Sequence, residues 1–296
     1  MVLLPPALAL GYRVLQDGRG YFWATSLLAA TLMSHVIYGY IAFLTLGILT
    51  LIQPTRISNL KSFVATMWPR WRRLITLVLL AGVVTSYFLV PTVLDRSFLN
   101  KSVFLDSVKY DSYGHSEVLK GLILGNLFDY DRLPFLTILL AFGFAICIFR
   151  WKQDRYPIPV AIFFFWRMVY FGRSTWGPLI DVSPMSRYLH MNRFIAGVHL
   201  GGILLIAVAL ATPWHWDVRR KNGLYAAAAL ALTVLVLLPV YSERRSYLAE
   251  NAAAIDLTQR AVIDEDNDLT ALFAKLKQLP PGRVYSGQQR GSLLTN

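Results

Sequence analysis

Four basic side chains in one short segment have residue types and a spacing that suit phosphate. Gly172–Arg193 contains a single acid, and its basic side chains are Arg173, Arg187, His190 and Arg193. On a helix, the i, i+3, i+6 spacing of the last three would place them on one broad face. Guanidinium forks match phosphate oxygens. The segment is therefore a candidate phosphate or pyrophosphate site. Contact with lipid headgroups or pairing with nearby acids would explain the same residues.

Arg167 is the only charge inside an otherwise uncharged stretch, Tyr156–Gly172. An arginine at membrane depth costs about 2.5–3.5 kcal/mol on insertion scales, so it usually faces protein or a wet cavity. Arg167 is therefore a further candidate for phosphate binding. The alternative is that it lies near the membrane surface, where its long side chain reaches the interface.

A pair of acids, Asp129 and Asp131, flanks Tyr130 just before an apolar segment. Two carboxylates at this spacing can hold a divalent cation beside a phosphate, which makes a divalent metal the one cofactor that the sequence suggests. Solvated loop acids are the alternative. The sequence contains no P-loop, dinucleotide fingerprint, zinc spacing or serine-hydrolase elbow.

These residues lie between apolar segments with the lengths of membrane helices. Apolar residues make up 55% of the 296 and charged residues only 16%, against about 25% charged in ordinary globular chains. A helix that crosses the bilayer needs about 20 apolar residues. We therefore predict an all-α polytopic membrane protein with about six to eight membrane helices. The candidate segments are Met1–Tyr12, Tyr21–Ser34, Val36–Ile52, Leu74–Leu94, Leu133–Phe149, Tyr156–Gly172, Phe194–Thr212 and Gly223–Tyr241.

Two features of the Phe194–Thr212 segment predict packing rather than chemistry. Gly197 and Gly201 form a GxxxG motif, which indicates close approach of another helix. We expect His199 to be a hydrogen-bonded core residue, with a proton carrier as the alternative.

The formal charge of +12 would suggest nucleic-acid binding in a soluble protein. Here it gathers in Pro54–Arg73 (net +5), Arg150–Arg155 (+2) and Pro213–Asn222 (+2). With one crossing per span these three loops share a side, and Lys and Arg collect in cytoplasmic loops. The charge thus indicates orientation and membrane lipids as partners, not nucleic acid. It places Asp95–Arg132, Gly172–Arg193 and the C-terminal tail on the outer, non-cytoplasmic side.

The chain divides by composition into a multi-span domain, 1–241, and a charged tail, 242–296. Ser242–Ile263 has a helical composition, and apolar residues recur on one face between Leu269 and Leu279. Arg283–Ser286 could begin a strand. We expect the tail to be the start of a soluble α/β domain on the outer side, with the remainder missing.

Three stretches together resemble a family of large prokaryotic membrane proteins. They are Ser34–His35 before Val36–Ile52, the run Leu127–Pro134, and Gly172–Pro178 followed by His190–Phe194. The family carries the label 6-pyruvoyl-tetrahydropterin synthase-related, and it is similar to type-C glycosyltransferases.

The resemblance implies an integral protein of a prokaryotic plasma membrane and a polyprenyl-phosphate sugar as donor. Type-C enzymes carry an acidic base in a first outer loop, and no such loop precedes Tyr21. The resemblance therefore implies a fragment that lacks the base, and only an anion-binding region carries over.

The first functional hypothesis is a glycosyltransferase-like protein with the basic side chains on the phosphate and Asp129 and Asp131 on a metal. The alternatives are a transporter or lipid flippase, which should show repeated halves and broken helices, and a non-enzymatic assembly subunit of the membrane.

Overall fold

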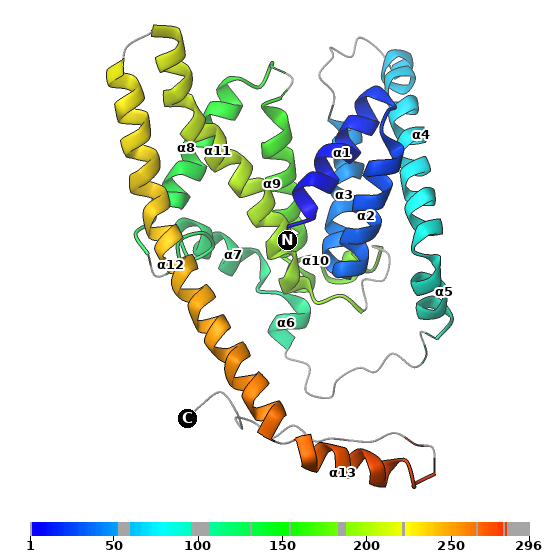
Figure 1. The fold of residues 1–296 in the computed structure, drawn as a ribbon. Coiled ribbons are helices and arrows are strands. Elements are labelled where there is room, and N and C mark those ends of the chain that lie inside the picture. The colour runs from blue at the N-terminus through cyan, green and yellow to red at the C-terminus, as the bar shows by residue number, and fades with distance from the viewer. Residues whose placement is uncertain are drawn as a thin grey trace. The chain divides into compact units, whose positions relative to one another are not determined.

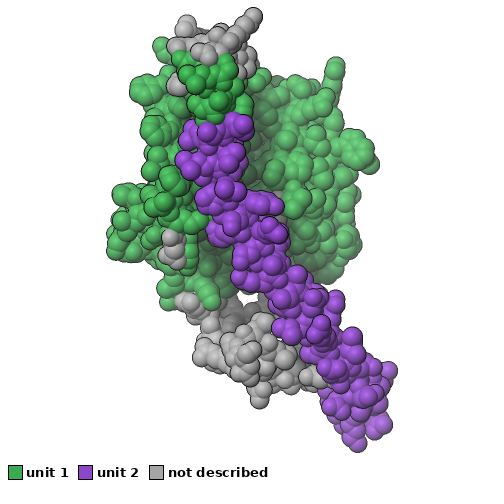
Figure 2. Space-filling view, turned by 60° about the vertical axis from the view of Figure 1, so that its left-hand side comes forward, with its two compact units in different colours: residues 1–229 green, residues 230–296 purple. Residues whose placement is uncertain are grey.

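The computed structural model describes residues 2–52, 60–95, 97, 107–130, 132–153, 155–182, 188–220, 223–264, 266–280 and 282 (Figure 1). Two of the predicted site residues, Arg187 and Asp131, lie outside these ranges, as does the predicted strand Arg283–Ser286. The chain forms two compact units, Met1–Ala229 and Leu230–Asn296 (Figure 2). The candidate site residues that are described all belong to the first unit.

The first unit begins with four helices that pack on one another: α1 (Leu4–Asp17), α2 (Tyr21–Ser34), α3 (Val36–Leu51) and α4 (Leu60–Val84). Gly18 ends α1 in the left-handed conformation, with φ 69°, which glycine adopts without a Cβ clash. The extended residue His35 separates α2 from α3. A side chain at Gly39 would come within 2.7 Å of the Leu32 Cα, so glycine allows this tight helix pair.

A second group consists of α8 (Phe135–Phe149), α9 (Pro157–Tyr170) and α11 (Ile195–Arg220), with α11 packed against both of the others (Figure 1). The GxxxG prediction is confirmed, because a side chain at Gly197 would collide with the Trp166 ring and one at Gly201 with the Phe163 backbone. Trp166 also donates a buried hydrogen bond from Nε1 to Thr45 Oγ1, at 2.9 Å. This bond ties α9 to α3 and so joins the two helix groups.

Short elements connect these groups. They are α5 (Ser86–Leu94), α6 (Ser107–Asp111), α7 (Gly114–Ile123), α10 (Arg173–Trp176) and the 3-10 turns η2 (Gly177–Val182) and η4 (Met191–Phe194). The helical face expected for Arg187, His190 and Arg193 is wrong for the two residues that the structure describes, because His190 is extended and only the η4 turn precedes α11. The spacing of His190 and Arg193 therefore does not place them on one helical face, and Arg187 lies outside the described residues.

Two helical stretches of the described chain are long and apolar enough to cross a membrane, Met191–His215 and Gly223–Asp264. A third qualifies if Phe63–Val84 and Ser86–Leu94, bent by 81°, count as one span. Thr85 lies at this bend and donates its hydroxyl to the Ala81 carbonyl at 2.7 Å, a bond that often accompanies helix bending. The coarse prediction of an all-α chain with membrane-spanning helices thus agrees with the structure.

The predicted number of six to eight spans does not follow from helix length. The apolar helices α3, α8 and α9 have only 14 to 16 residues. At 1.5 Å per residue even α3 is about 24 Å long, short of the roughly 30 Å hydrocarbon core. Hydropathy finds apolar segments, but whether each one crosses the bilayer depends on where its helix ends.

The second unit contains most of α12 (Gly223–Asp264) and α13 (Asp266–Leu276). The composition change after Tyr241 falls inside α12, which continues through Pro239 and beyond. The described residues of this unit form no strand, so they do not support the predicted α/β domain. Amphipathic periodicity predicts a helix, but it does not distinguish an all-α domain from an α/β domain.

Candidate phosphate-binding site

Five side chains from three separate segments meet where α6 packs against η4. We call this group the basic junction, and its members are Lys109, Tyr110, Arg173, His190 and Arg193. Lys109 and Tyr110 belong to α6, Arg173 opens α10, and the last two lie at η4. The junction therefore sits at the start of the membrane-length stretch Met191–His215, which contains Arg193.

Arg173 holds the junction together. Its Nη1 donates a hydrogen bond to the Tyr110 carbonyl at 2.8 Å and a longer one to the Leu189 carbonyl at 3.4 Å. Its guanidinium carbon lies 3.9 Å from the centre of the Tyr110 ring, within the range of a cation–π contact. The edge of the same ring faces His190, at 6.2 Å between ring centres. Arg173 thus fixes α6 and residue 189 relative to each other.

A network of short hydrogen bonds fixes the turn that carries Arg173. Ser112 Oγ donates to the Tyr170 carbonyl at 2.6 Å, and Ser174 Oγ donates to the Ser112 carbonyl at 2.8 Å. Gly172 has φ 67°, and a side chain there would collide with the Asp111 carbonyl. Only glycine fits this backbone at such close approach. The turn at the start of α10 therefore requires Gly172.

Three cationic side chains of the basic junction act on the imidazole ring of His190. Burial lowers the pKa of His190, and the charges of Arg193, Arg173 and Lys109 lower it further. Each effect disfavours the protonated ring, so His190 is neutral at neutral pH. A neutral imidazole can still donate a hydrogen bond to an anion.

Lys109 and Arg193 differ from Arg173 in their hydrogen-bond partners. Both are exposed, and within the described ranges neither makes a hydrogen bond or an ion pair. Arg173 is occupied with backbone carbonyls, whereas these two cations remain able to contact a ligand. An anion bound here would gain two charge-assisted contacts without breaking an existing one.

Arg167 does not belong to the basic junction. It lies in the last turn of α9, with its guanidinium 4.6 Å from the centre of the Phe164 ring. Its buried Nε has no hydrogen-bond partner among the residues that the structure describes. Arg167 is also absent from the charges that shift His190. Among the described residues, Arg167 makes no hydrogen bond or ring contact with the members of the basic junction, with which the sequence grouped it.

The Asp129 carboxylate caps the start of α8. Asp129 is only 2% exposed. Its Oδ1 accepts a hydrogen bond from the Leu136 N–H, and its Oδ2 accepts from the Thr137 N–H, each at 2.8 Å. The Thr137 hydroxyl donates a third bond at 2.7 Å. The first N–H groups of a helix lack internal partners and favour negative charge, which accounts for this buried acid.

The structure gives Asp129 a different role from the metal binding that the sequence suggests for Asp129 and Asp131. Both Asp129 oxygens already accept hydrogen bonds, and Asp131 lies outside the described residues. Across the described parts of the chain, no group of three or more His, Cys, Asp or Glu side chains could hold a metal ion. We therefore assign Asp129 to the cap of α8.

His199 has the core hydrogen bond that the sequence predicts. Its Nε2 lies 2.8 Å from the Leu127 carbonyl, so the protonated nitrogen donates to that oxygen. Its ring packs on Phe128 at 5.3 Å between centres. The contact holds the turn before α8 against α11 and leaves His199 a structural residue.

Sequence reasoning missed Lys109 and Tyr110 because their segment, Asp95–Arg132, has a net charge of −1 and gives no sign of a basic site. Only the docking of α6 on η4 brings Lys109 close to residues more than 60 positions away. The pattern of Lys109 and Tyr110 alone carries no signal for this contact.

No family model, no curated protein and no solved structure matches this chain.

Proposed function

We propose that the protein is an integral membrane protein that binds a phosphate-linked lipid substrate at the basic junction, in the manner of a glycosyltransferase that uses a polyprenyl-phosphate sugar. The observation that carries the proposal is the packing of α6 against η4, with Arg173 on Tyr110 and Tyr110 beside His190, which places Lys109, Arg173 and Arg193 within electrostatic reach of His190. Three cations at the end of a membrane-length helix suit a phosphate attached to a hydrophobic tail.

Each residue of the junction has a distinct role in this proposal. Arg193 and Lys109 contact the phosphate oxygens, because both are exposed cations without another partner within the described ranges. Neutral His190 donates a hydrogen bond to the same anion. Arg173 is a positioning residue, since its guanidinium is committed to Tyr110 and Leu189. No side chain is assigned as the base that would activate an acceptor hydroxyl.

The finer membrane arrangement belongs to the same proposal. The short apolar helices α2 and α3, with α8 and α9, enter the bilayer as partial crossings. Together with the long helices they make up the six to eight segments that hydropathy indicates. The charge distribution favours an arrangement with the basic junction and the tail outside, and the prokaryotic plasma membrane is what the family resemblance implies.

Binding of a polyprenyl phosphate to the full chain in lipid nanodiscs tests the proposal. Arg193→Gln and Lys109→Gln should each weaken binding about tenfold, as expected when one charge-assisted contact is lost. Lys120→Gln is the matched control, because Lys120 is an exposed cation on the neighbouring helix α7. Wild-type affinity in both junction variants, or an equal loss in the control, would contradict the proposal.

A lipid transporter or flippase is the second candidate, and the bend of 81° between α4 and α5 favours it. Broken helices of this kind occur at the substrate sites of transporters. The two candidates differ in product. A transferase releases the sugar from its lipid donor, whereas a flippase moves the intact lipid between leaflets of a reconstituted vesicle.

A further inference from the structure

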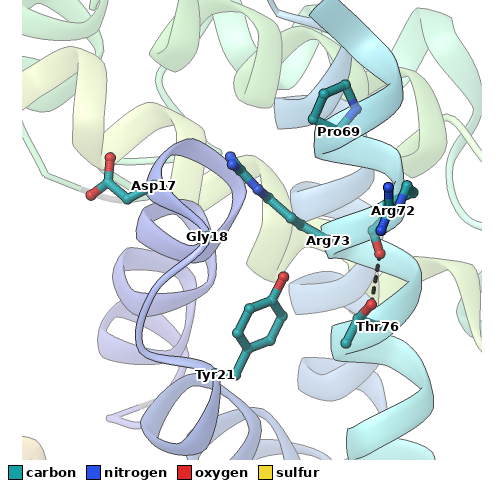
Figure 3. Close-up of a pocket in the computed structure, with 7 residues that line it drawn as sticks. All are labelled: Asp17, Gly18, Tyr21, Pro69, Arg72, Arg73 and Thr76. Atoms are coloured by element: carbon teal, nitrogen blue, oxygen red, sulfur yellow. Dashed lines mark hydrogen bonds between the residues drawn. The ribbon is translucent and has the colours of Figure 1, made fainter.

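A second cationic site lies between the α1–α2 turn and α4, and it shares no residue with the basic junction. A cavity of about 330 Å³ is lined by the α1–α2 turn and by one side of α4. We call it the α4 pocket. Its lining residues are Asp17, Gly18, Tyr21, Pro69, Arg72, Arg73 and Thr76 (Figure 3).

Arg73 forms the inner wall of the α4 pocket. Its Nη1 donates to the Leu15 carbonyl at 2.8 Å and to the Gln16 carbonyl at 2.6 Å, which satisfies the C-terminal end of α1. Its Nε and Nη2 face Gly18, where a Cβ would lie 3.0 and 3.2 Å from them. In Figure 3 the Arg73 side chain reaches from α4 to this turn. Glycine at position 18 thus leaves part of the guanidinium uncovered.

The remaining polar groups of the α4 pocket suit an anion. Arg72 is exposed and its side chain makes no hydrogen bond or ion pair within the described chain. The Tyr21 hydroxyl points toward Arg73 (Figure 3). The acid of the set, Asp17, lies 4.0 Å from Arg13 on the same helix, so its charge has a separate partner. Two arginines and one hydroxyl donor therefore face a space large enough for a phosphate group.

Exposed aromatic residues flank the α4 pocket on both helices that form it. Exposed Trp68 precedes the lining residue Pro69 on α4, and exposed Phe22 and Trp23 follow the lining residue Tyr21 on α2. Trp and Tyr side chains prefer the membrane–water interface, and basic segments there attract anionic lipids. The surroundings thus suit a phosphate held at the interface.

An apolar stripe leads away from the α4 pocket along α4. Leu79, Leu80 and Val83 are all exposed. They follow the lining residues Arg72, Arg73 and Thr76 at spacings of three and four, so they continue the same face of the helix. This face extends about two turns beyond Thr76. An acyl chain that follows it would leave the lipid phosphate next to Arg72 and Arg73.

From these observations we infer that the α4 pocket binds the phosphate of an anionic phospholipid, with the acyl chain along the stripe of Leu79, Leu80 and Val83. Arg72 and the uncovered part of Arg73 contact the phosphate oxygens, and Tyr21 donates a further hydrogen bond. The site is independent of the substrate proposed for the basic junction, since the two share no residue.

Lipid retention by the full-length protein tests this inference. The protein is placed in nanodiscs of phosphatidylcholine that contain a small fraction of phosphatidylglycerol, and the bound lipid is counted by native mass spectrometry. Wild type should enrich phosphatidylglycerol over phosphatidylcholine. Arg72→Gln should reduce this enrichment about tenfold, and Tyr21→Phe about threefold.

Arg19→Gln is the matched control, because Arg19 is an exposed cation of the α1–α2 turn that does not line the α4 pocket. It should leave the enrichment within twofold of wild type. An equal loss in Arg19→Gln and Arg72→Gln would mean general surface attraction and would overturn the site. Displacement of the lipid by millimolar inorganic phosphate, with no preference for phosphatidylglycerol, would overturn the lipid assignment in favour of free phosphate.

Discussion

Arginines at the two ends of the first unit do different work. On α4, Arg70 is 8% exposed and donates to the Ile52 carbonyl and to Gln16, at 3.1 and 2.8 Å. Arg73 likewise binds the last carbonyls of α1. At the basic junction, Arg173 is occupied in the same way, but Arg193 is exposed and unpaired within the described part of the chain.

The comparison teaches that the charge of a loop does not measure its capacity to bind an anion. Pro54–Arg73, which the sequence indicated as a loop but which from Leu60 onward belongs to α4, has the highest net charge of the segments compared, +5. Two of its arginines bind the carbonyls of helix C-termini, where cations are favourable. Gly172–Arg193 has a net charge of only +2 but joins Lys109 from another segment. The useful quantity is the number of cations that remain without an intramolecular partner.

Replacing Arg70 with Met should have the largest effect on stability. The Ile52 carbonyl and the Gln16 side chain would lose a charged donor, so we expect a loss of about 2–3 kcal/mol in the free energy of unfolding. Denaturant unfolding in detergent micelles, followed by tryptophan fluorescence, measures the change. Arg193→Met is the comparison and should alter stability by less than about 0.5 kcal/mol. Equal losses in both variants would remove the distinction between the two ends.

Replacing Asp129 with Ala should destabilise the protein by about 2 kcal/mol, because three hydrogen-bond donors at the start of α8 lose their acceptor. The same unfolding measurement, made with and without Mg²⁺, separates this cap from the metal role suggested by the sequence. We expect the loss to be independent of Mg²⁺. A wild-type protein that Mg²⁺ stabilises, but an Asp129→Ala variant that it does not, would restore the metal assignment.

His190 provides the smallest and most specific prediction. Its pKa is lowered in the folded protein by burial and by Arg193, Arg173 and Lys109. Unfolding therefore takes up a proton once the pH falls below the ordinary histidine pKa of about 6.5. Stability should decrease as the pH falls through that value, and the loss should be complete below the lowered pKa. Thermal unfolding at pH 7.5 and 5.5 should show a smaller decrease for His190→Gln than for wild type. An identical pH dependence would place His190 outside the influence of these cations.

The sequence identified features whose physical cause is local. Apolar runs such as Phe135–Phe149 and Pro157–Tyr170 form helices at the places where hydropathy finds them. Gly197 and Gly201 mark close packing, because only a missing side chain lets Trp166 and the Phe163 backbone approach. His199 forms a core hydrogen bond, as expected for a buried polar side chain among apolar ones.

Features that depend on contacts between distant segments could not be predicted. The sequence suggests that Asp129 is a metal ligand together with Asp131. In the structure the Asp129 carboxylate instead accepts hydrogen bonds from the N–H groups of Leu136 and Thr137. The helical spacing of His190 and Arg193 fails because η4 precedes α11. Neither outcome is encoded in the residue types alone, since each depends on how the backbone turns between two helices.

The sequence by itself therefore determined that this is an all-α chain with membrane-length helices and where its charges lie along the chain. These properties follow from burial of apolar side chains and from the cost of placing charge in hydrocarbon. Tertiary structure decided which cations remain available to a ligand. It brought Lys109, Arg173 and Arg193 within electrostatic reach of His190, assigned Arg70 and Arg73 to helix ends, and broke the α4–α5 segment at Thr85. The physical reason is that a hydrogen bond or a Coulomb contact depends on distance in space, which the order of residues does not specify.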